Sequence, residues 1–424
     1  MGMDKKQKPT ICVIGGSAAG MAASICAARE GAKVILIEGN EKLGRKIYAT
    51  GNGKCNFLNI DQDRSHFHTS GDPAWISDAL NCMDNDFVLT FFHELGLPSV
   101  VRHGGYYYPA NESAATVVTC LEDEIDRLGV EVILSDRMRS LRYEDGRFSV
   151  QLRSGRAFEA DAVILAMGGS ASPKFGSDGS GYYYAKNFGH TIVEPLPALC
   201  PLKLKENGAT FSVWAGTRIN DASITLIIDE KPVISEKGEI LFTDYGISGI
   251  PVFQVAGSAA IALEKNQKVS VEIDLAPGTD PEDAENAFPE WREYFGERTL
   301  QEQLSRIFPV KLIEALKVIP DRNKKMATMK ATAFGKAFDT LKHLRFDVFY
   351  TSGFEQAQVS SGGVSLPEVE PVTMESKKQP GLYFAGELLD VYGDCGGYNL
   401  QFAFTSGAIA GRAAAQSCLQ GGRE

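Results

Sequence analysis

Two glycine-rich segments near opposite ends of this 424-residue chain carry the residues best suited to chemistry. Near the C-terminus, Gly381–Glu387 reads Gly-Leu-Tyr-Phe-Ala-Gly-Glu, and Gly393 and Gly396-Gly397-Tyr398-Asn399 follow it. Near the N-terminus, Ile11–Gly20 is typical of a strand, a glycine turn and a helix start. Such a turn aims backbone N–H groups at a phosphate. One turn alone indicates some dinucleotide, whereas the pair indicates FAD held between both chain ends.

The N-terminal segment supplies most of a dinucleotide-binding fingerprint. Gly15 permits the tight turn, Gly20 allows close helix–strand packing, and Ser17 replaces the middle glycine of the usual pattern. The Ser17 hydroxyl could itself bond a phosphate. Glu38 ends the next strand, where a carboxylate accepts hydrogen bonds from ribose hydroxyls and repels a 2′-phosphate. A glycine pattern alone is often only a turn, but strand, helix and acid agree here.

Two further segments suit the same cofactor. Leu43–Asn56 is glycine-rich and basic, which favours an anionic ligand, although a solvated loop would look similar. Glu387 follows a buried strand and can accept hydrogen bonds from ribityl hydroxyls. Gly396-Gly397 precede a predicted helix of about sixteen residues from Asn399, whose positive end would face the flavin pyrimidine. The alternative is a C-terminal helix with no ligand.

Composition sets the remaining limits. Hydrophobic residues make up 44%, charged residues 23%, and the net charge is -11 with a pI near 5.2, so we expect neither nucleic-acid nor membrane binding. The eight cysteines form no C-x-x-C pair and have no zinc spacing, which favours free thiols and no metal. No signal peptide is seen, and Val252–Leu263 is too short to span a bilayer. We therefore expect a cytoplasmic protein.

The order of strand and helix patterns predicts an α/β fold with a discontinuous Rossmann-type FAD-binding domain. We assign residues 1–190 and 355–424 to that domain, residues 191–279 and 325–354 to an inserted β-rich, barrel-like domain, and residues 280–324 to a small helical insert. Within the barrel-like part, short strands are expected at Ser223–Ile228, Pro232–Ile234, Glu239–Phe242 and Val269–Ile273.

With these residues in view, the chain resembles the BaiN-like (YhiN-like) bacterial NAD(P)/FAD-dependent oxidoreductases. The matching segments are Gly15–Gly20, Leu43–Asn59, Gly105–Pro109, Ala166–Gly181 with Gly189-His190, Gly238–Pro251, Gln358–Val364 and Gly381–Gly411. The chain departs from the family pattern at Ser17, Met167, Asp244 and Ile250. The resemblance implies the same interrupted FAD domain, and an activity that reduces a conjugated double bond of an oxo-steroid in bacterial bile-acid metabolism.

The resemblance and the motifs together give the predicted cofactor contacts. These are Gly15, Gly16, Ser17, Ala18, Ala19, Gly20, Glu38, Gly39, Gly44, Arg45, Lys46, Thr50, Gly51, Asn52, Gly53, Lys54, Cys55, Asn56, Met138, Ala166, Met167, Gly168, Gly386, Glu387, Gly397, Tyr398, Asn399, Leu400 and Gln401.

The leading hypothesis is an FAD-dependent reductase in which NAD(P)H supplies hydride to a C=C conjugated to a carbonyl in a small, apolar, oxo-steroid-like substrate. Tyr398, Tyr392 and Cys395 are candidate proton donors. NAD(P)H would dock transiently, because only one dinucleotide fingerprint is visible. Two alternatives stay open: an oxidase or dehydrogenase that uses oxygen or a quinone, and a non-catalytic flavin-bound sensor or interaction protein. The sequence does not indicate an oligomeric state.

Overall fold

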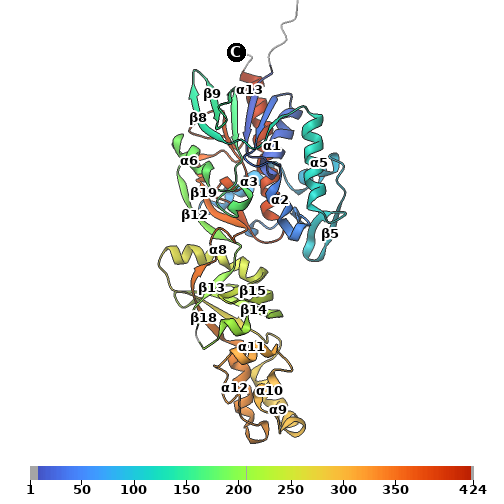
Figure 1. Ribbon diagram of the computed structural model, residues 1–424, viewed down its shortest axis with the longest axis vertical. Coiled ribbons are helices and arrows are strands. Elements are labelled where there is room, and N and C mark those ends of the chain that lie inside the picture. Colours follow the sequence, from blue (N-terminus) through green and yellow to red (C-terminus); the bar gives the residue numbers. More distant parts are fainter. Residues whose placement is uncertain (1–7, 207, 422–424) are drawn as a thin grey trace, which may run out of the picture. The chain divides into compact units, whose positions relative to one another are not determined.

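The computed structural model describes residues 8–206 and 208–421. Of these, the residues up to Pro195 and from Val359 onward form one compact unit, and Leu196–Gln358 form a second (Figure 1). The first unit is therefore built from both ends of the chain, and it contains every predicted cofactor contact.

A five-stranded parallel sheet forms the centre of the first unit. Its order is β20 (Leu382–Phe384), β11 (Ala162–Leu165), β1 (Thr10–Ile14), β2 (Lys33–Ile37) and β7 (Glu131–Ile133). Strand β1 pairs Ile14 with Leu165 on one side and with Ile37 on the other. Parallel strands end at one shared edge, so this register brings the residues after β1, β2, β11 and β20 together. The predicted Rossmann-type α/β fold is confirmed.

Two helices from opposite chain ends pack closely beside this sheet. Helix α1 (Ala18–Arg29) follows β1, and α13 (Tyr398–Gly421) closes the described chain. Gly407 and Gly411 of α13 face α1 so closely that an added Cβ would lie 2.9 Å from the carbonyl carbons of Ala19 and Ala23. The predicted helix of about sixteen residues was too short, because the Ala-rich sequence after Arg412 continues it to Gly421 for 24 residues.

Smaller elements complete the first unit. Its further helices are α2 (Arg45–Tyr48), α3 (Pro73–Cys82), α4 (Asn85–Glu94), α5 (Ala114–Arg127) and α6 (Ser180–Asn187). An antiparallel sheet joins β8 (Met138–Glu144), β9 (Arg147–Leu152) and β10 (Ala157–Ala160), and another joins β3 (Leu58–Asn59), β6 (Tyr106–Pro109) and β5 (Ser99–Arg102). Two strand pairs are β4 (Phe67–His68) with β21 (Tyr392–Gly393), and β12 (Ile192–Ala198) with β19 (Val359–Val364).

The second unit contains a closed antiparallel barrel. In spatial order its strands are β13 (Leu202–Leu204), β16 (Gly246–Ser248), β15 (Lys231–Phe242), β14 (Arg218–Ile228), β17 (Val269–Asp274) and β18 (Leu344–Thr351). Its helices are α7 (Phe211–Trp214), α8 (Ile250–Glu264), α9 (Pro281–Phe295), α10 (Leu300–Leu304), α11 (Val310–Ala315) and α12 (Ala331–Lys342). The two strands expected at Pro232–Ile234 and Glu239–Phe242 form one strand, β15. Its polar middle pairs with β14, since backbone ladders do not require apolar side chains.

Short single-turn helices lie between these elements. They are η1 (Thr50–Gly53), η2 (Arg64–His66), η3 (His103–Gly105), η4 (Pro173–Phe175), η5 (Met326–Thr328), η6 (Leu366–Glu368) and η7 (Gly386–Leu388). Among residues 8–206 and 208–421, no helix combines the length and the apolarity that crossing a bilayer requires.

Candidate cofactor site

The turn between β1 and α1 can be made only by glycine at two positions. Gly15 has φ of +106°, and a Cβ there would lie 2.8 Å from the carbonyl carbon of Ala166 and still closer to its oxygen. A Cβ on Gly20 would lie 2.9 Å from the carbonyl carbon of Gly15. Ser17 is the N-cap of α1 but makes no side-chain capping bond. The turn therefore leaves the first turn of α1 open to an anionic group.

Glu38 closes this turn from the end of β2. One carboxylate oxygen accepts the backbone N–H of Gly16 at 2.7 Å, and the other accepts the backbone and side-chain N–H groups of Asn40 at 2.8 and 2.7 Å. The carboxylate is half-buried and keeps lone pairs for further donors. Its position beside the helix N-terminus is the one expected for a ribose-binding acid.

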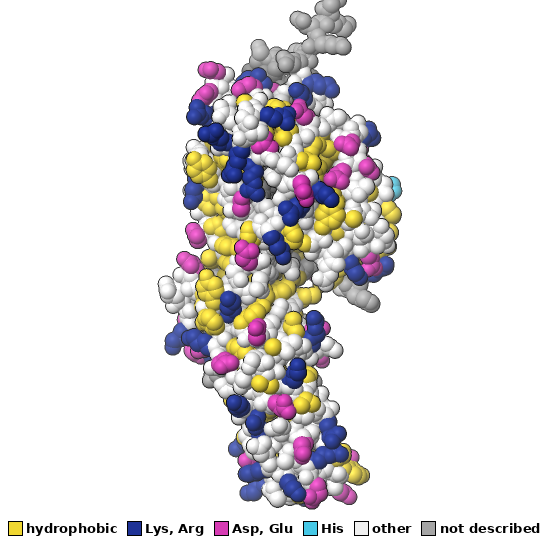
Figure 2. All heavy atoms as spheres, viewed as in Figure 1, with side chains coloured by type: hydrophobic (Ala, Val, Ile, Leu, Met, Phe, Trp, Pro, Cys, Tyr) yellow, Lys and Arg dark blue, Asp and Glu magenta, His cyan; other side chains and the backbone are white. Residues whose placement is uncertain are grey.

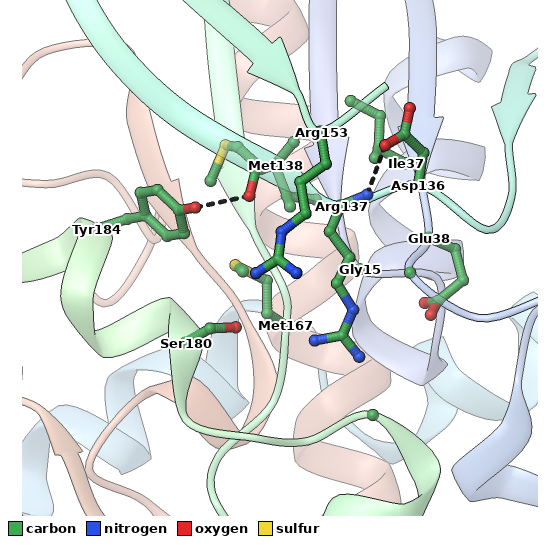
Figure 3. A pocket seen from close by; sticks show the side chains of 13 residues that line it. Gly15, Ile37, Glu38, Asp136, Arg137, Met138, Arg153, Met167, Ser180 and Tyr184 are labelled. Atoms are coloured by element: carbon green, nitrogen blue, oxygen red, sulfur yellow. Dashed lines mark hydrogen bonds between the residues drawn. The ribbon is translucent and has the colours of Figure 1, made fainter. Parts of the chain in front are cut away.

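A pocket opens directly beside Gly15 and Glu38. It is lined by Ile14, Gly15, Ile37, Glu38, Gly39, Asp136, Arg137, Met138, Arg153, Met167, Gly176, Ser180 and Tyr184. Figure 3 shows the side chains of Arg137 and Arg153 extending into it, with Arg137 drawn between Arg153 and Glu38. Arg137 also pairs with Asp178. The lining has two acids, of which Asp136 accepts hydrogen bonds from the backbone N–H groups of Arg137 and Ser154. The two cations and Glu38 beside a glycine turn suit the phosphate and ribose groups of a nucleotide.

The structure brings five predicted contacts into this one pocket, namely Gly15, Glu38, Gly39, Met138 and Met167. The Met138 carbonyl accepts a 2.7 Å hydrogen bond from the Tyr184 hydroxyl, which holds the backbone at that point. Sequence reasoning missed Arg137, Arg153 and Tyr184. Arg137 stands next to Met138 in the chain, which was a usable signal. Arg153 gave none, because only the pairing of β8 with β9 brings it across.

A second group of predicted residues meets around Glu387. Lys46 Nζ lies 2.6 Å from one Glu387 oxygen. The other oxygen accepts the backbone N–H and the hydroxyl of Ser360 at 3.0 and 3.1 Å. Gly169, after β11, leaves no room for a side chain here, since a Cβ would lie 2.8 Å from that oxygen. The ends of β11 and β20, helix α2 and strand β19 therefore converge on one carboxylate.

A third group joins the basic loop to the start of α13. With its amide oriented to match its neighbours, Asn56 donates to the carbonyls of Leu58 and Tyr107 and accepts from Gly397 N–H at 3.3 Å. A Cβ on Gly397 would lie 2.7 Å from the Leu58 nitrogen. Asn399 bonds both backbone groups of Gly393, at 2.8 and 2.7 Å. These bonds fix the glycine loop immediately before the helix.

The remaining predicted contacts lie around these three groups. Arg45 and Gly51–Lys54 are exposed, and Lys54 pairs with Glu112 at 2.7 Å. Cys55 is fully buried, and that burial raises the pKa of its thiol to about 12. Gln401 is fully buried and donates to Gln62 at 3.0 Å. Whether each of these residues touches a cofactor stays a prediction.

The candidate proton donors surround the same glycine loop. Tyr398 is 2% exposed and Tyr392 is 8% exposed, while Cys395 is half-buried. Burial is the main cause that raises the pKa of both phenols, and nearby carboxylates including Asp394 raise it further. Both tyrosines therefore hold their protons at neutral pH. Within the part of the chain that the structure describes, no group of three or more His, Cys, Asp or Glu side chains is arranged for a metal ion.

A family model described as the HI0933-like protein Rossmann domain matches residues 9–413. The chain belongs to this FAD-dependent Rossmann family. It is 40% identical over 410 residues to a 3-dehydro-bile acid delta(4,6)-reductase of Clostridium scindens, covering 96% of this chain and 99% of the relative. The predicted family is thereby confirmed, and the chain is an FAD-dependent oxidoreductase rather than a non-catalytic sensor.

Two more distant proteins extend the comparison. A ribosomal RNA dihydrouridine synthase of Haemophilus influenzae is 29% identical over 399 residues, which cover 93% of this chain and 95% of that protein. The open conformation of a flavocytochrome c3 fumarate reductase has a TM-score of 0.51 at 19% identity and covers 98% of this chain and 79% of that chain. At that identity the likeness to the fumarate reductase concerns the fold alone.

The residues present fit FAD. The glycine cradle at Gly15 and Gly20 excludes any Cβ, and Glu38, Arg137 and Arg153 line the adjoining pocket. The Lys46–Glu387 and Asn56–Gly397 groups lie in the same unit as that pocket.

Proposed function

We propose that this protein saturates a C=C bond conjugated to a carbonyl in a small, apolar, oxo-steroid-like compound, with NAD(P)H as the electron donor. The observation that carries the proposal is the 40% identity to a 3-dehydro-bile acid delta(4,6)-reductase over nearly the full length of both chains. Overall, the reaction consumes one NAD(P)H and one proton for each double bond that is saturated.

The residues of the first unit would hold FAD in three places. Arg137, Arg153 and Glu38 would bind its adenosine and phosphate groups, and the N-terminus of α1 would face the pyrophosphate. Lys46 and Glu387 would meet the ribityl chain, and the first turn of α13 would face the pyrimidine. When bound, FAD supplies the hydride chemistry.

The chain's own residues would position the reacting groups and hold a proton. Gly396 is confined between two phenol rings, since a Cβ there would lie 3.1 Å from carbon atoms of both Tyr106 and Tyr398. These phenols keep their protons at neutral pH, because burial raises the pKa of each. A protonated phenol beside the glycine loop is the group type that can deliver a proton to the carbon next to a carbonyl.

A second candidate function is reduction of uridine in ribosomal RNA, favoured by the full-length similarity to a ribosomal RNA dihydrouridine synthase. The chemistry is related, because the uracil double bond is also conjugated to a carbonyl. The charge of the protein favours the small substrate over RNA. The net charge is -11, and two exposed arginines at the β8–β9–β10 sheet pair with acids, Arg147 with Asp161 and Arg156 with Glu131. RNA binding usually requires unpaired basic groups along one face.

The surface view agrees with this reading. On the face shown in Figure 2, Lys and Arg side chains are interspersed with Asp and Glu side chains over both units. Several basic side chains gather on the first unit, but acidic groups accompany them. We therefore place the small oxo compound first and RNA second.

The test combines a spectrum with two substrates. The purified protein should show a flavin absorption band, and NADH or NADPH should bleach it under anaerobic conditions. Addition of a 3-oxo-4,6-diene steroid should then restore the band and yield a product that is two mass units heavier. A ribosomal RNA transcript serves as the competing substrate, with dihydrouridine detected by mass spectrometry. Turnover of RNA alone would reverse our order, and rapid reoxidation by oxygen or a quinone with neither substrate would favour an oxidase.

A further inference from the structure

Two histidines and two aspartates form a connected network beside the start of α13. His66 ends η2 and His68 lies in β4, while Asp61 follows β3 and Asp394 lies in the loop after β21. Asp394 joins both histidines: one of its oxygens is 2.9 Å from His66 Nδ1 and the other is 2.7 Å from His68 Nε2. The second ring nitrogen of His66, Nε2, is 3.1 Å from an Asp61 oxygen.

This geometry determines the protonation state of His66. A neutral imidazole has one N–H donor and one lone pair, whereas both ring nitrogens of His66 face carboxylate oxygens at hydrogen-bond distance. Only the imidazolium donates from both nitrogens. Burial lowers the pKa of His66, but the hydrogen bonds to Asp394 and Asp61 outweigh it, so the net pKa is above the usual value of 6.5.

Among the side chains that the structure describes, no cation acts on His66 to oppose this charge. The other groups facing His66 are the Tyr398 ring, stacked at a 4.5 Å centroid distance, and the carboxylate of Asp63, whose charge is felt at His66. Arg64, on the same short helix, donates instead to Asn81 at 3.1 Å. Acidic and aromatic neighbours both favour an imidazolium.

The network holds the glycine loop that leads into α13. Asp394 N–H donates to the His66 carbonyl at 2.9 Å, and Gly393 pairs with Phe67. The His66 ring covers Tyr398, the first residue of α13. If His66 loses a proton, one ring nitrogen presents a lone pair to a carboxylate, and the bond to Asp61 or to Asp394 becomes repulsive. The side-chain link from Asp61 through His66 to Asp394 is then broken at one end, while the other bonds of the loop remain.

We infer that His66 is a positioning residue of the flavin site that acts only as an imidazolium, because it ties Asp394, and with it the Gly393–Gly397 loop, to Asp61. This inference rests on the FAD site of the proposed function. It gives His66, His68 and Asp394, which share no sequence motif, a common role in holding this loop. FAD binding should accordingly weaken as the pH rises through the pKa of His66.

Two substitutions separate this role from ordinary packing. Asp394→Asn keeps the shape of the side chain, and its amide N–H can donate to the lone pair of a neutral His66 while its oxygen still accepts from His68. That variant should hold the loop without a charge on His66. His66→Gln cannot bridge the two acids at any pH. The control is His93→Gln, an exposed histidine in the last turn of α4.

The experiment measures the FAD dissociation constant from about pH 6 to about pH 8.5, together with the titration of His66 in 15N-histidine-labelled apoprotein by NMR. As the pH rises across this range, we expect the FAD affinity of the wild type and of His93→Gln to fall by roughly tenfold or more, which is the scale of one charge-assisted hydrogen bond. Asp394→Asn should bind FAD with a flat pH profile near the low-pH wild-type affinity, and His66→Gln should bind it weakly throughout.

Each other result overturns the inference. A wild-type profile that is flat, or a fall of equal size in Asp394→Asn, would show that the charge on His66 does not matter. An NMR titration of His66 below pH 6.5 would contradict the imidazolium directly. Complete absence of FAD binding in the wild type would overturn the proposed function as well, whereas normal FAD binding without the pH dependence would overturn this inference alone.

Discussion

Replacement of Gly15 by alanine tests the cofactor cradle most directly, because the chain contains a matched control. Gly15 and Gly31 both have positive φ, at +106° and +98°, so alanine is strained at each. A Cβ on Gly15 would lie 2.8 Å from the carbonyl carbon of Ala166, while nothing lies within 4 Å of a Cβ on Gly31. The two variants therefore share the backbone penalty and differ in the steric clash.

The expected magnitudes follow from these two terms. Positive φ costs a residue with a side chain about 1–2 kcal/mol, which both variants should lose in unfolding free energy. In Gly15→Ala the carbonyl carbon of Ala166, just after β11, must also move from 2.8 Å to the 3.4 Å of an ordinary contact with the new Cβ. Such crowding costs about 1–3 kcal/mol more. That movement displaces the turn whose N–H groups face the cofactor, so we expect FAD affinity to fall by roughly tenfold or more in Gly15→Ala only.

The assay is FAD titration by fluorescence quenching, with urea unfolding of the same samples. Gly31→Ala should bind FAD like the wild type although it is less stable. If Gly15→Ala binds FAD as tightly as Gly31→Ala, the close approach of Gly15 to Ala166 is irrelevant to the ligand, and the cradle argument is refuted.

Three further predictions concern single features of the first unit. Lys46→Met removes the cation from a Glu387 carboxylate that is 16% exposed, so the unfolding free energy in urea should fall by about 2 kcal/mol; no change would mean that Ser360 alone satisfies this group. Hydrogen bonds from Lys54 and Arg102 lower the pKa of Glu112 from 4.5 to about 2, so the stability they give is present above pH 4.5 and lost as the pH falls toward 2. Thermal melts across that range should show a shallower acid slope for Glu112→Gln. Burial raises the pKa of the Cys12, Cys26 and Cys55 thiols to about 12, so iodoacetamide at about pH 8 should modify exposed Cys82 first, as peptide mass spectrometry would report.

Local patterns were enough to predict the core of the cofactor domain. The apolar residues of β1 are followed directly by the turn at Gly15 and by the Ala-rich α1. Glu38 then follows at the spacing of the dinucleotide-binding fingerprint. The barrel was expected from alternating strands, although its polar strand β15 was divided in two, because exposed positions carry no apolar signal.

Contacts between distant segments could not be predicted in this way. Strand β8 reads Met-Arg-Ser-Leu-Arg-Tyr-Glu, which is too polar to be recognised as a strand, so the position of Arg153 beside Arg137 was not visible. His66 and Asp394 are 328 residues apart and share no motif. Such pairs depend on which strand ends and loops meet in three dimensions. Local sequence patterns do not show these contacts.

This protein must hold FAD and must also select its substrate, and different residues meet these two requirements. In the proposed FAD site, Gly15, Glu38 and Arg137 would recognise groups that every FAD molecule carries, so their arrangement would be set by the cofactor and would say little about the substrate. The conjugated carbonyl compounds named for the two relatives differ greatly in size and charge. Residues that choose among such compounds must therefore differ from those that hold FAD.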